Sequence, residues 1–229
     1  MRRRDLGLWL LAMAAAATQA NAQVAPSPGE VQAYGGLHRA AWSGDLPRLG
    51  ALIRHGADLQ ARDGRGRTAL HVATHAHQRG AIRVLVQAGA RLDTLDDDRY
   101  DAVTIAAVAD DPMTLALLLS LGASAKQTTS RYDGTALIAA AHLGHDEVVR
   151  QLIAAGAPLD HVNNLHWTAV IESIVLGDGG ARHQRTLGLL VDAGADLQLA
   201  DRQGNTPLQL ARTRGYAAMA DRLKAAGAS

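Results

Sequence analysis

The sequence contains no cysteine and no phenylalanine, and aromatic residues make up only 3% of its 229 positions. The absence of cysteine excludes disulfide bonds, thiol catalysis and cysteine-ligated metal. With so few rings, the interior must be filled by Ala, Leu, Val and Ile. Such small, regular side chains suit a stack of similar layers better than one large irregular core. Lysine is also scarce, because only Lys126 and Lys224 accompany the arginines.

The first residues have the layout of a secretory signal. Arg2 to Arg4 are followed by an apolar stretch from Leu6 to Ala17, and Ala20-Asn21-Ala22 places small residues at a cleavage site. The apolar stretch is shorter than the roughly 20 residues that span a bilayer as a helix. We therefore predict a signal peptide over residues 1–22, cut after Ala22, and a periplasmic or secreted protein. An uncleaved anchor and a twin-arginine signal are the alternatives.

The predicted mature chain is nearly neutral. Three of the 23 basic and one of the 22 acidic side chains lie within residues 1–22, so the remaining 207 residues carry a net charge of −1. Nucleic-acid binding draws on clustered Lys and Arg. We expect no nucleic-acid partner and no membrane association after cleavage. Residues 23–32, with Pro26 and Pro28, are predicted to form a flexible leader.

Six of the Gly-Ala pairs in the chain recur at a nearly fixed period, with spacings of 33, 33, 34, 38 and 33 residues. The pairs are Gly56-Ala57, Gly89-Ala90, Gly122-Ala123, Gly156-Ala157, Gly194-Ala195 and Gly227-Ala228. A period of this size indicates one supersecondary unit that has been copied and stacked. Such an array usually works through a long exposed surface instead of a deep pocket.

A second element lies about 21 residues before most of these pairs. It reads Thr68-Ala69-Leu70-His71, Thr135-Ala136-Leu137-Ile138, Thr168-Ala169-Val170-Ile171 and Thr206-Pro207-Leu208-Gln209. Apolar residues at helical spacing separate the two elements, and a turn-rich stretch follows each Gly-Ala pair. Thr at the head of the first helix can cap its free amides, and Gly after the second helix can supply the left-handed backbone that ends it.

The pattern resembles the ankyrin repeat, through Thr-Ala/Pro-Leu-His, the Ala-Ala-x-x-Gly of residues 40–44 and 140–144, and the Gly-Ala endings. The resemblance implies an all-α solenoid of six helix-turn-helix repeats joined by outward-pointing hairpin loops, the fingers. The repeat domain would span residues 33–229. Its predicted repeats are residues 33–60, 61–93, 94–126, 127–160, 161–198 and 199–229.

Two repeats depart from the pattern. The fifth carries five extra residues within Gly177 to Gln184, between its two helices. They could form a tolerated surface insertion or an additional contact lobe. The third lacks the usual Thr and His, and its finger holds the acidic run from Asp96 to Asp101.

Motifs for metals and nucleotides are weak. His71 and His75 share a helix face with His77 close by, but a zinc site needs three or four converging ligands. The run from Asp96 to Asp101 lacks the central Gly and closing Glu of a calcium loop. Gly64 to Ala69 imitates a dinucleotide motif without its strand. We expect no metal and no cofactor.

The resemblance also implies a recognition surface, because fingers and first helices of this family line a concave groove. Trp, Tyr and Arg dominate binding energy at protein interfaces. The candidate partner-binding residues are Trp42, Arg65, Arg67, His75, Arg99, Tyr100, Tyr132, His142, His166, Trp167 and Arg202.

These features predict a monomeric, exported, non-catalytic module that binds another protein through the groove and fingers. No nucleophile elbow, phosphate loop or paired-carboxylate arrangement is present, so we expect no enzyme. The resemblance to small exported bacterial ankyrin proteins, some associated with catalase function, adds peroxide resistance as an expected pathway. An immunity-like inhibitor of a toxin or enzyme is one alternative. A metal- or small-ligand-binding protein that uses His71, His75 and His142 is another.

Overall fold

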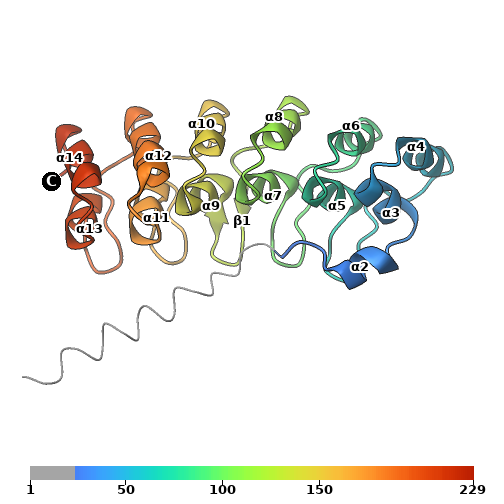
Figure 1. Cartoon of the computed structure of the whole chain (residues 1–229), viewed down its shortest axis with the longest axis horizontal. Coiled ribbons are helices and arrows are strands. Elements are labelled where there is room, and N and C mark those ends of the chain that lie inside the picture. The colour runs from blue at the N-terminus through green and yellow to red at the C-terminus, as the bar shows by residue number, and fades with distance from the viewer. Residues whose placement is uncertain (1–23) are drawn as a thin grey trace, which may run out of the picture.

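The computed structural model describes residues 24–229. The predicted signal peptide, residues 1–22, lies outside the described residues. Within residues 24–229, helices α3 to α14 form six pairs that stand in a row (Figure 1). The pairs are α3 (Gly36–Ser43) with α4 (Leu46–Arg54), α5 (Ala69–His75) with α6 (Arg79–Gln87), α7 (Ala102–Val108) with α8 (Pro112–Ser120), α9 (Ala136–Leu143) with α10 (Asp146–Ala154), α11 (Ala169–Val175) with α12 (Ala181–Asp192), and α13 (Pro207–Thr213) with α14 (Ala217–Ala225). The predicted all-α solenoid of six helix-turn-helix repeats is confirmed.

In the second to sixth repeats the first helix begins at a Thr or Asp cap, whereas Gly35 before α3 has no side chain to cap it. The hydroxyl of Thr135 accepts from the amide of Ile138 at the start of α9. In the third repeat Asp101 replaces the threonine, and its carboxylate accepts from the amide of Thr104 at 2.7 Å. The glycines of the six Gly-Ala pairs all have positive φ, between 78° and 99°. Side chains other than Gly are disfavoured in that backbone region, which explains why the glycine recurs.

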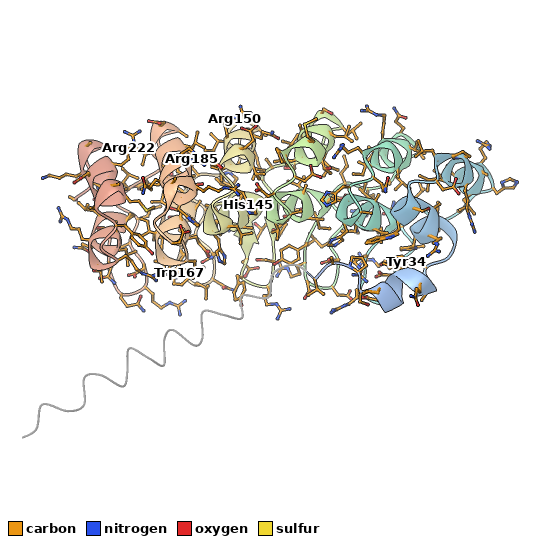
Figure 2. The ribbon with its side chains drawn as sticks, viewed as in Figure 1. Tyr34, His145, Arg150, Trp167, Arg185 and Arg222 are labelled. Carbon is orange, nitrogen blue, oxygen red and sulfur yellow. The ribbon has the colours of Figure 1, made fainter. Side chains whose placement is uncertain are left out.

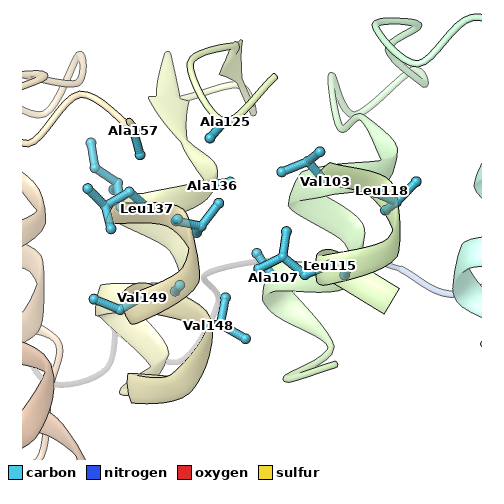
Figure 3. Packing of buried hydrophobic residues seen from close by; sticks show 14 of the residues in the cluster. Val103, Ala107, Leu115, Leu118, Ala125, Ala136, Leu137, Val148, Val149 and Ala157 are labelled. Carbon is cyan, nitrogen blue, oxygen red and sulfur yellow. The ribbon is translucent and has the colours of Figure 1, made fainter. Parts of the chain in front are cut away.

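The core runs as one continuous layer between neighbouring repeats (Figure 3). The paired alanines of the first helices are fully buried, as at Ala140 and Ala141. Their small side chains let α9 pack closely against α7 on one side and α11 on the other. The longer apolar residues, such as Leu115, Leu118 and Val149, fill the space toward the second helices. Each repeat therefore buries its apolar faces mainly against the repeats beside it.

The fingers lie along one edge of the row, next to the first helices (Figure 1). The only strands in residues 24–229 are β1 (Thr128–Thr129) and β2 (Gly134–Thr135), which pair antiparallel within the fourth repeat's finger. The Gly-Ala pairs on either side of this finger, Gly122-Ala123 and Gly156-Ala157, are 34 residues apart instead of 33. The additional residue lies in this finger and lengthens the hairpin.

The leader predicted to be flexible over residues 23–32 is partly helical, which corrects that expectation. Helix α2 spans Pro28–Ala33 and lies on the finger side of α3. Ser27 and Glu30 form a capping box, in which each side chain bonds the other's backbone amide. Pro28 occupies the first turn, where it costs no hydrogen bond. Of the two prolines that suggested flexibility, Pro28 is therefore part of a helix start and Pro26 precedes its cap.

The extra residues of the fifth repeat do not project as a separate lobe. Helix α12 has 12 residues, whereas α10 has nine, so part of the insertion lengthens the helix. The connecting loop is fixed by Tyr216, whose hydroxyl donates to the carbonyl of Gly177 at 2.9 Å. Arg182 reaches across the fourth repeat to Asp110 at 2.8 Å. The insertion therefore links the third, fourth, fifth and sixth repeats.

Candidate functional site

The fingers are numbered here by the repeat that each one opens. Finger 2 is residues 62–67, finger 3 is 95–100, finger 4 is 128–134, finger 5 is 162–167 and finger 6 is 200–205. In four of them a backbone bond closes the loop, as between the amide of Asp63 and the carbonyl of Arg67 at 2.9 Å. The carboxylate of Asp63 also accepts from the amides of Arg65 and Arg67. These bonds hold the loop backbone in one conformation.

Neighbouring fingers are also bonded to each other. The amide of Asp97 donates to the carbonyl of Arg65, that of Ser130 to Arg99, and that of Asn164 to Tyr132. Between fingers 5 and 6 the guanidinium of Arg202 replaces the amide and donates to the carbonyl of Asn164 at 2.9 Å. The fingers thus form one connected row, and together with the first helices they make a surface that we call the finger face.

The arginines of fingers 3 and 4 are each paired with a carboxylate of the other finger. Arg99 lies 3.0 Å from Asp133, and Arg131 lies 2.7 Å from Asp98. These pairs are exposed, so each contributes at most about 1 kcal/mol to stability. Their consequence for recognition is larger, because neither arginine is left without a counter-charge.

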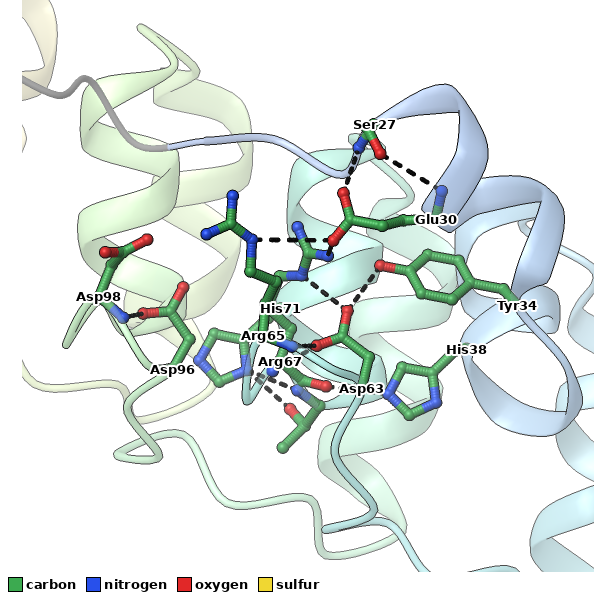
Figure 4. Close-up of polar contacts among 11 residues, drawn as sticks. Ser27, Glu30, Tyr34, His38, Asp63, Arg65, Arg67, His71, Asp96 and Asp98 are labelled. Carbon is green, nitrogen blue, oxygen red and sulfur yellow. Dashed lines mark hydrogen bonds and ion pairs between the residues drawn. The ribbon is translucent and has the colours of Figure 1, made fainter.

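Helix α2 packs against finger 2 and covers Arg67, as Figure 4 shows. The guanidinium of Arg67 pairs with Asp63 at 2.7 Å and with Glu30 of α2, and Arg67 is only 1% exposed. The hydroxyl of Tyr34 donates to Asp63 at 2.8 Å. Arg67 is therefore unavailable to a partner, and its prediction as a binding residue is wrong. The sequence places it at an exposed finger position; α2 is what buries it.

A hollow of about 560 Å³ lies between α2 and finger 2. Glu30, Tyr34, His38 and Asp63 are among its lining residues. Most of their polar groups already bond to each other or to Arg67, and the ring of His38 bonds the carbonyl of Arg67 at 2.9 Å. The polar side chains that line the hollow are therefore explained by their role in holding α2 and α3 against finger 2.

Finger 5 has the same backbone bonds and different side chains. Asn163 accepts from the amides of Leu165 and Trp167, both at 3.0 Å. Val162 is 42% exposed and Leu165 is 37% exposed, while Trp167 is half-buried at the edge of the row (Figure 2). Sequence reasoning did not single out Val162 or Leu165. Their signal is an apolar residue at a position where the second repeat has arginine.

The predicted residues on the first helices lie apart from the fingers. Trp42, His75 and His142 stand at or near the ends of α3, α5 and α9, away from the fingers that precede these helices. All three are half-buried. Burial lowers the pKa of His75 to about 4, so its ring is neutral at physiological pH. The structure therefore brings together the seven finger residues other than Arg67, and places these three at the opposite end of the first helices.

A buried carboxyl lies under the finger face beside His142. Glu172 of α11 is 5% exposed and accepts a 2.9 Å hydrogen bond from the amide nitrogen of Asn163. Its other oxygen lies 3.5 Å from Nδ1 of His142. Burial raises the pKa of Glu172 to about 7 and lowers that of His142. Because burial favours the neutral form of both groups, the contact is not a stable ion pair.

His71 has a structural role. Its Nδ1 accepts from the amide of Thr68, and its Nε2 donates to the carbonyls of Thr94 and Tyr100 at 3.0 and 3.1 Å. Burial lowers the pKa of His71 to about 4, which matches a neutral ring with one donor and one acceptor. The ring ties α5 to the base of finger 3, and both nitrogens are used.

Neither a metal-binding cluster nor a membrane-spanning helix is found in the part of the chain that the structure describes. Within residues 24–229, no cluster of three or more His, Asp or Glu side chains is placed to hold a metal ion. Over the same residues, no helix combines the length and apolar character needed to cross a bilayer.

Comparison with known proteins agrees with this architecture. A family model described as ankyrin repeats (3 copies) matches residues 37–129 and 114–201. The chain belongs to the ankyrin repeat family. The ankyrin repeat protein YahD of Escherichia coli (strain K12) is 34% identical over 190 residues, which are 82% of this chain and 94% of that protein.

Solved structures of ankyrin domains also superpose on it. An ankyrin repeat domain from Acinetobacter baumannii AYE has 44% identity and a TM-score of 0.80, covering 84% of this chain and 98% of that one. The ankyrin repeat domain of Bcl-3, a member of the IkappaB protein family, has 27% identity and a TM-score of 0.77, covering 86% and 88%. Ankyrin repeats are protein-protein interaction modules, and the fold is generally non-catalytic.

Proposed function

We propose that this protein binds a partner protein through the finger face and acts without catalysis. The observation that carries the proposal is the row of fingers, held by backbone bonds, in which Tyr132 and Leu165 are exposed on neighbouring loops. A surface fixed before binding loses little entropy when a partner docks. Exposed aromatic and apolar side chains on such a surface supply binding energy when they are covered.

Tyr132 gives the sharpest test of this proposal. We expect Tyr132→Ala to weaken partner capture at least tenfold, since the ring is 38% exposed and contributes little to the core. The same is expected of Trp167→Ala. The control is Met113→Ala, which removes a 66% exposed apolar side chain from α8, a second helix on the side of the row away from the fingers.

The measurement is crosslinking of the protein in its native cell envelope, followed by mass spectrometry of the captured proteins. Circular dichroism and thermal melting of each variant accompany it. If Tyr132→Ala and Trp167→Ala capture as much as Met113→Ala does, the finger face is not the binding surface. Loss of helicity in both would mean that these rings are structural.

We further propose export to the periplasm, on the sequence layout of residues 1–22. Cell fractionation and the N-terminal mass of the mature protein test this, with Gln23 as the expected first residue. Retention of residues 1–22, or a cytoplasmic location, would contradict it.

Peroxide resistance is the pathway that we propose, on the resemblance to small exported bacterial ankyrin proteins. Deletion of the encoding sequence is expected to lower survival in hydrogen peroxide, and the intact sequence should restore it. Unchanged survival would remove this part of the proposal and leave protein binding unaffected.

Inhibition of an enzyme or toxin is a second candidate, which would use the same face. The fold is shared, at 22% identity and a TM-score of 0.70, by a solved structure of the Bd0816 predatory endopeptidase from Bdellovibrio bacteriovorus in complex with immunity protein Bd3460. If the captured partner is an enzyme, its activity with and without this protein decides between inhibition and simple binding.

A further inference from the structure

Fingers 3, 4 and 5 each hold a residue other than glycine in the left-handed backbone region. Arg99 has φ 64°, Asp133 has φ 52° and His166 has φ 65°. At the matching positions of fingers 2 and 6 the residues are Gly66 and Gly204, with φ 71° and 81°. A side chain at such a position destabilises the loop, so something must compensate for keeping it.

For two of the three residues the compensation is visible. Arg99 and Asp133 pair with each other at 3.0 Å across fingers 3 and 4. His166 differs from them. Among residues 24–229 its ring makes no hydrogen bond or ion pair, and the residue is exposed. Nothing within the described chain explains why a histidine replaces glycine at the tip of finger 5.

Fingers 4, 5 and 6 also expose apolar side chains and one arginine near His166. Tyr132, Val162 and Leu165 are exposed on fingers 4 and 5, which are joined by the bond from the amide of Asn164 to the carbonyl of Tyr132. On the other side, Arg202 of finger 6 bonds the carbonyl of Asn164 through its guanidinium. These contacts place the apolar side chains of fingers 4 and 5 directly beside a basic side chain of finger 6.

The acidic groups of these fingers are already occupied. Asp133 is paired with Arg99. Asp201 accepts from the amides of Gln203 and Asn205 and from the side-chain amide of Asn205. Asp201 and Arg202 make finger 6 neutral overall, but Arg202 forms no ion pair among residues 24–229, so its guanidinium is left for a carboxylate of a partner.

We infer that the tips of fingers 4, 5 and 6 recognise a segment of a partner protein in which apolar side chains are followed by acidic ones. The apolar side chains cover Tyr132, Val162 and Leu165, and the acidic ones meet His166 and Arg202. The inference rests on the proposed function, since it specifies the partner chemistry of the finger face. His166 is kept at a strained position because the partner uses its ring.

His166→Gly separates this role from a structural one. Glycine relieves the left-handed backbone, so we expect the melting temperature to rise by about 2–4 °C. At the same time the affinity for the partner segment should fall at least tenfold. A residue with a purely structural role would not gain stability while losing affinity.

The probe is a random peptide library displayed on phage and selected against the purified full chain, followed by titration of the enriched peptides. We expect peptides that combine apolar and acidic residues, with affinities reduced at least tenfold by His166→Gly and by Arg202→Ala. Met113→Ala is the control and should bind as the unaltered protein does.

Enrichment of basic peptides, of no peptide, or of peptides that bind His166→Gly unchanged would overturn the inference. Crosslinking in the cell envelope is a separate readout of the proposed function. A partner captured there through Tyr132, together with one of these library outcomes, would leave the proposed function standing and refute only the apolar and acidic specificity.

Discussion

Fingers 2 and 5 are the same loop with opposite chemistry, and their matching residues lie 100 positions apart. Arg62, Arg65 and Arg67 of finger 2 become Val162, Leu165 and Trp167 in finger 5. The backbone does not change, since Asp63 and Asn163 accept from equivalent amides in both loops. The repeat therefore specifies the loop conformation, and the variable positions specify what the loop does.

The location of charge is also reversed between the two repeats. In the second repeat the buried charge is in the finger, on Arg67, and the helix position that follows is Val72. In the fifth repeat the finger is uncharged and the buried acid is Glu172, at the position that matches Val72. Finger 2 is joined to α2 through its buried charge, whereas Val162, Leu165 and His166 of finger 5 are exposed.

The largest expected effect is a loss of stability when the buried charge of finger 2 is removed. Arg67→Ala removes a buried guanidinium and leaves Asp63 and Glu30 without their counter-charge, which we expect to lower the free energy of unfolding by about 3 kcal/mol. Arg65→Ala is the matched control, because Arg65 is exposed and lies 3.8 Å from Glu30. It should change stability by less than about 0.5 kcal/mol.

Chemical denaturation of both variants checks this prediction. Equal stabilities for Arg67→Ala and Arg65→Ala would mean that α2 does not depend on the ion pair. In that case the assignment of finger 2 to a structural role would be wrong.

The next effect concerns the buried acid of the fifth repeat. The pKa of Glu172 is raised from 4.5 to about 7 in the folded protein, so the folded state holds a proton that the unfolded chain releases. Stability from this group is therefore present at low pH and is lost as pH rises from about 4.5 through about 7. The full loss is on the order of 3 kcal/mol.

Glu172→Gln should abolish this pH dependence and be more stable than the unaltered protein at pH 8. Asn163 can still donate to the glutamine oxygen. Chemical denaturation at pH values from 4.5 to 8 measures this pH dependence of stability, with Glu147→Gln as the control. Arg150 lowers the pKa of Glu147 to about 2, so that group does not titrate in this window. A parallel pH profile for Glu172→Gln and the unaltered protein would contradict the account.

A smaller effect tests the match between Asn163 and Glu172. Asn163→Asp keeps the oxygen that accepts from the finger amides and replaces the donor to Glu172 by a second acceptor. We expect a loss of about 2 kcal/mol at pH 8 and a smaller one at pH 5, where Glu172 is protonated. Asn164→Asp, at the exposed neighbour, is the control. If Asn163→Asp loses the same stability at pH 8 and at pH 5, the hydrogen bond between Asn163 and Glu172 does not contribute to that stability.

The repeats and fingers could be read from the sequence because each depends on local chemistry that recurs. Glycine at positive φ, a capping Thr or Asp, and apolar residues at helical spacing set the helix ends wherever they occur. The capping box of Ser27 and Glu30 with Pro28 was also readable, although the prolines of that segment suggested a flexible leader.

The state of the individual side chains was not accessible in the same way. The burial of Arg67 requires α2 to lie against finger 2, a contact between segments 37 residues apart. Leu165 and His166 differ from Arg65 and Gly66 only by substitution, and they are exposed because no helix within residues 24–229 covers finger 5. Repetition predicts the scaffold, while the neighbours of each loop decide which residues are free.

We propose that partner recognition depends on finger 5 and not on finger 2. The direct measurement is partner capture by Leu165→Asp and by Arg65→Asp, which place the same charge at matching positions of the two loops. We predict at least a tenfold loss of capture for Leu165→Asp, with no loss for Arg65→Asp and similar melting of both. Equal capture by the two variants, or a loss confined to Arg65→Asp, would contradict the account.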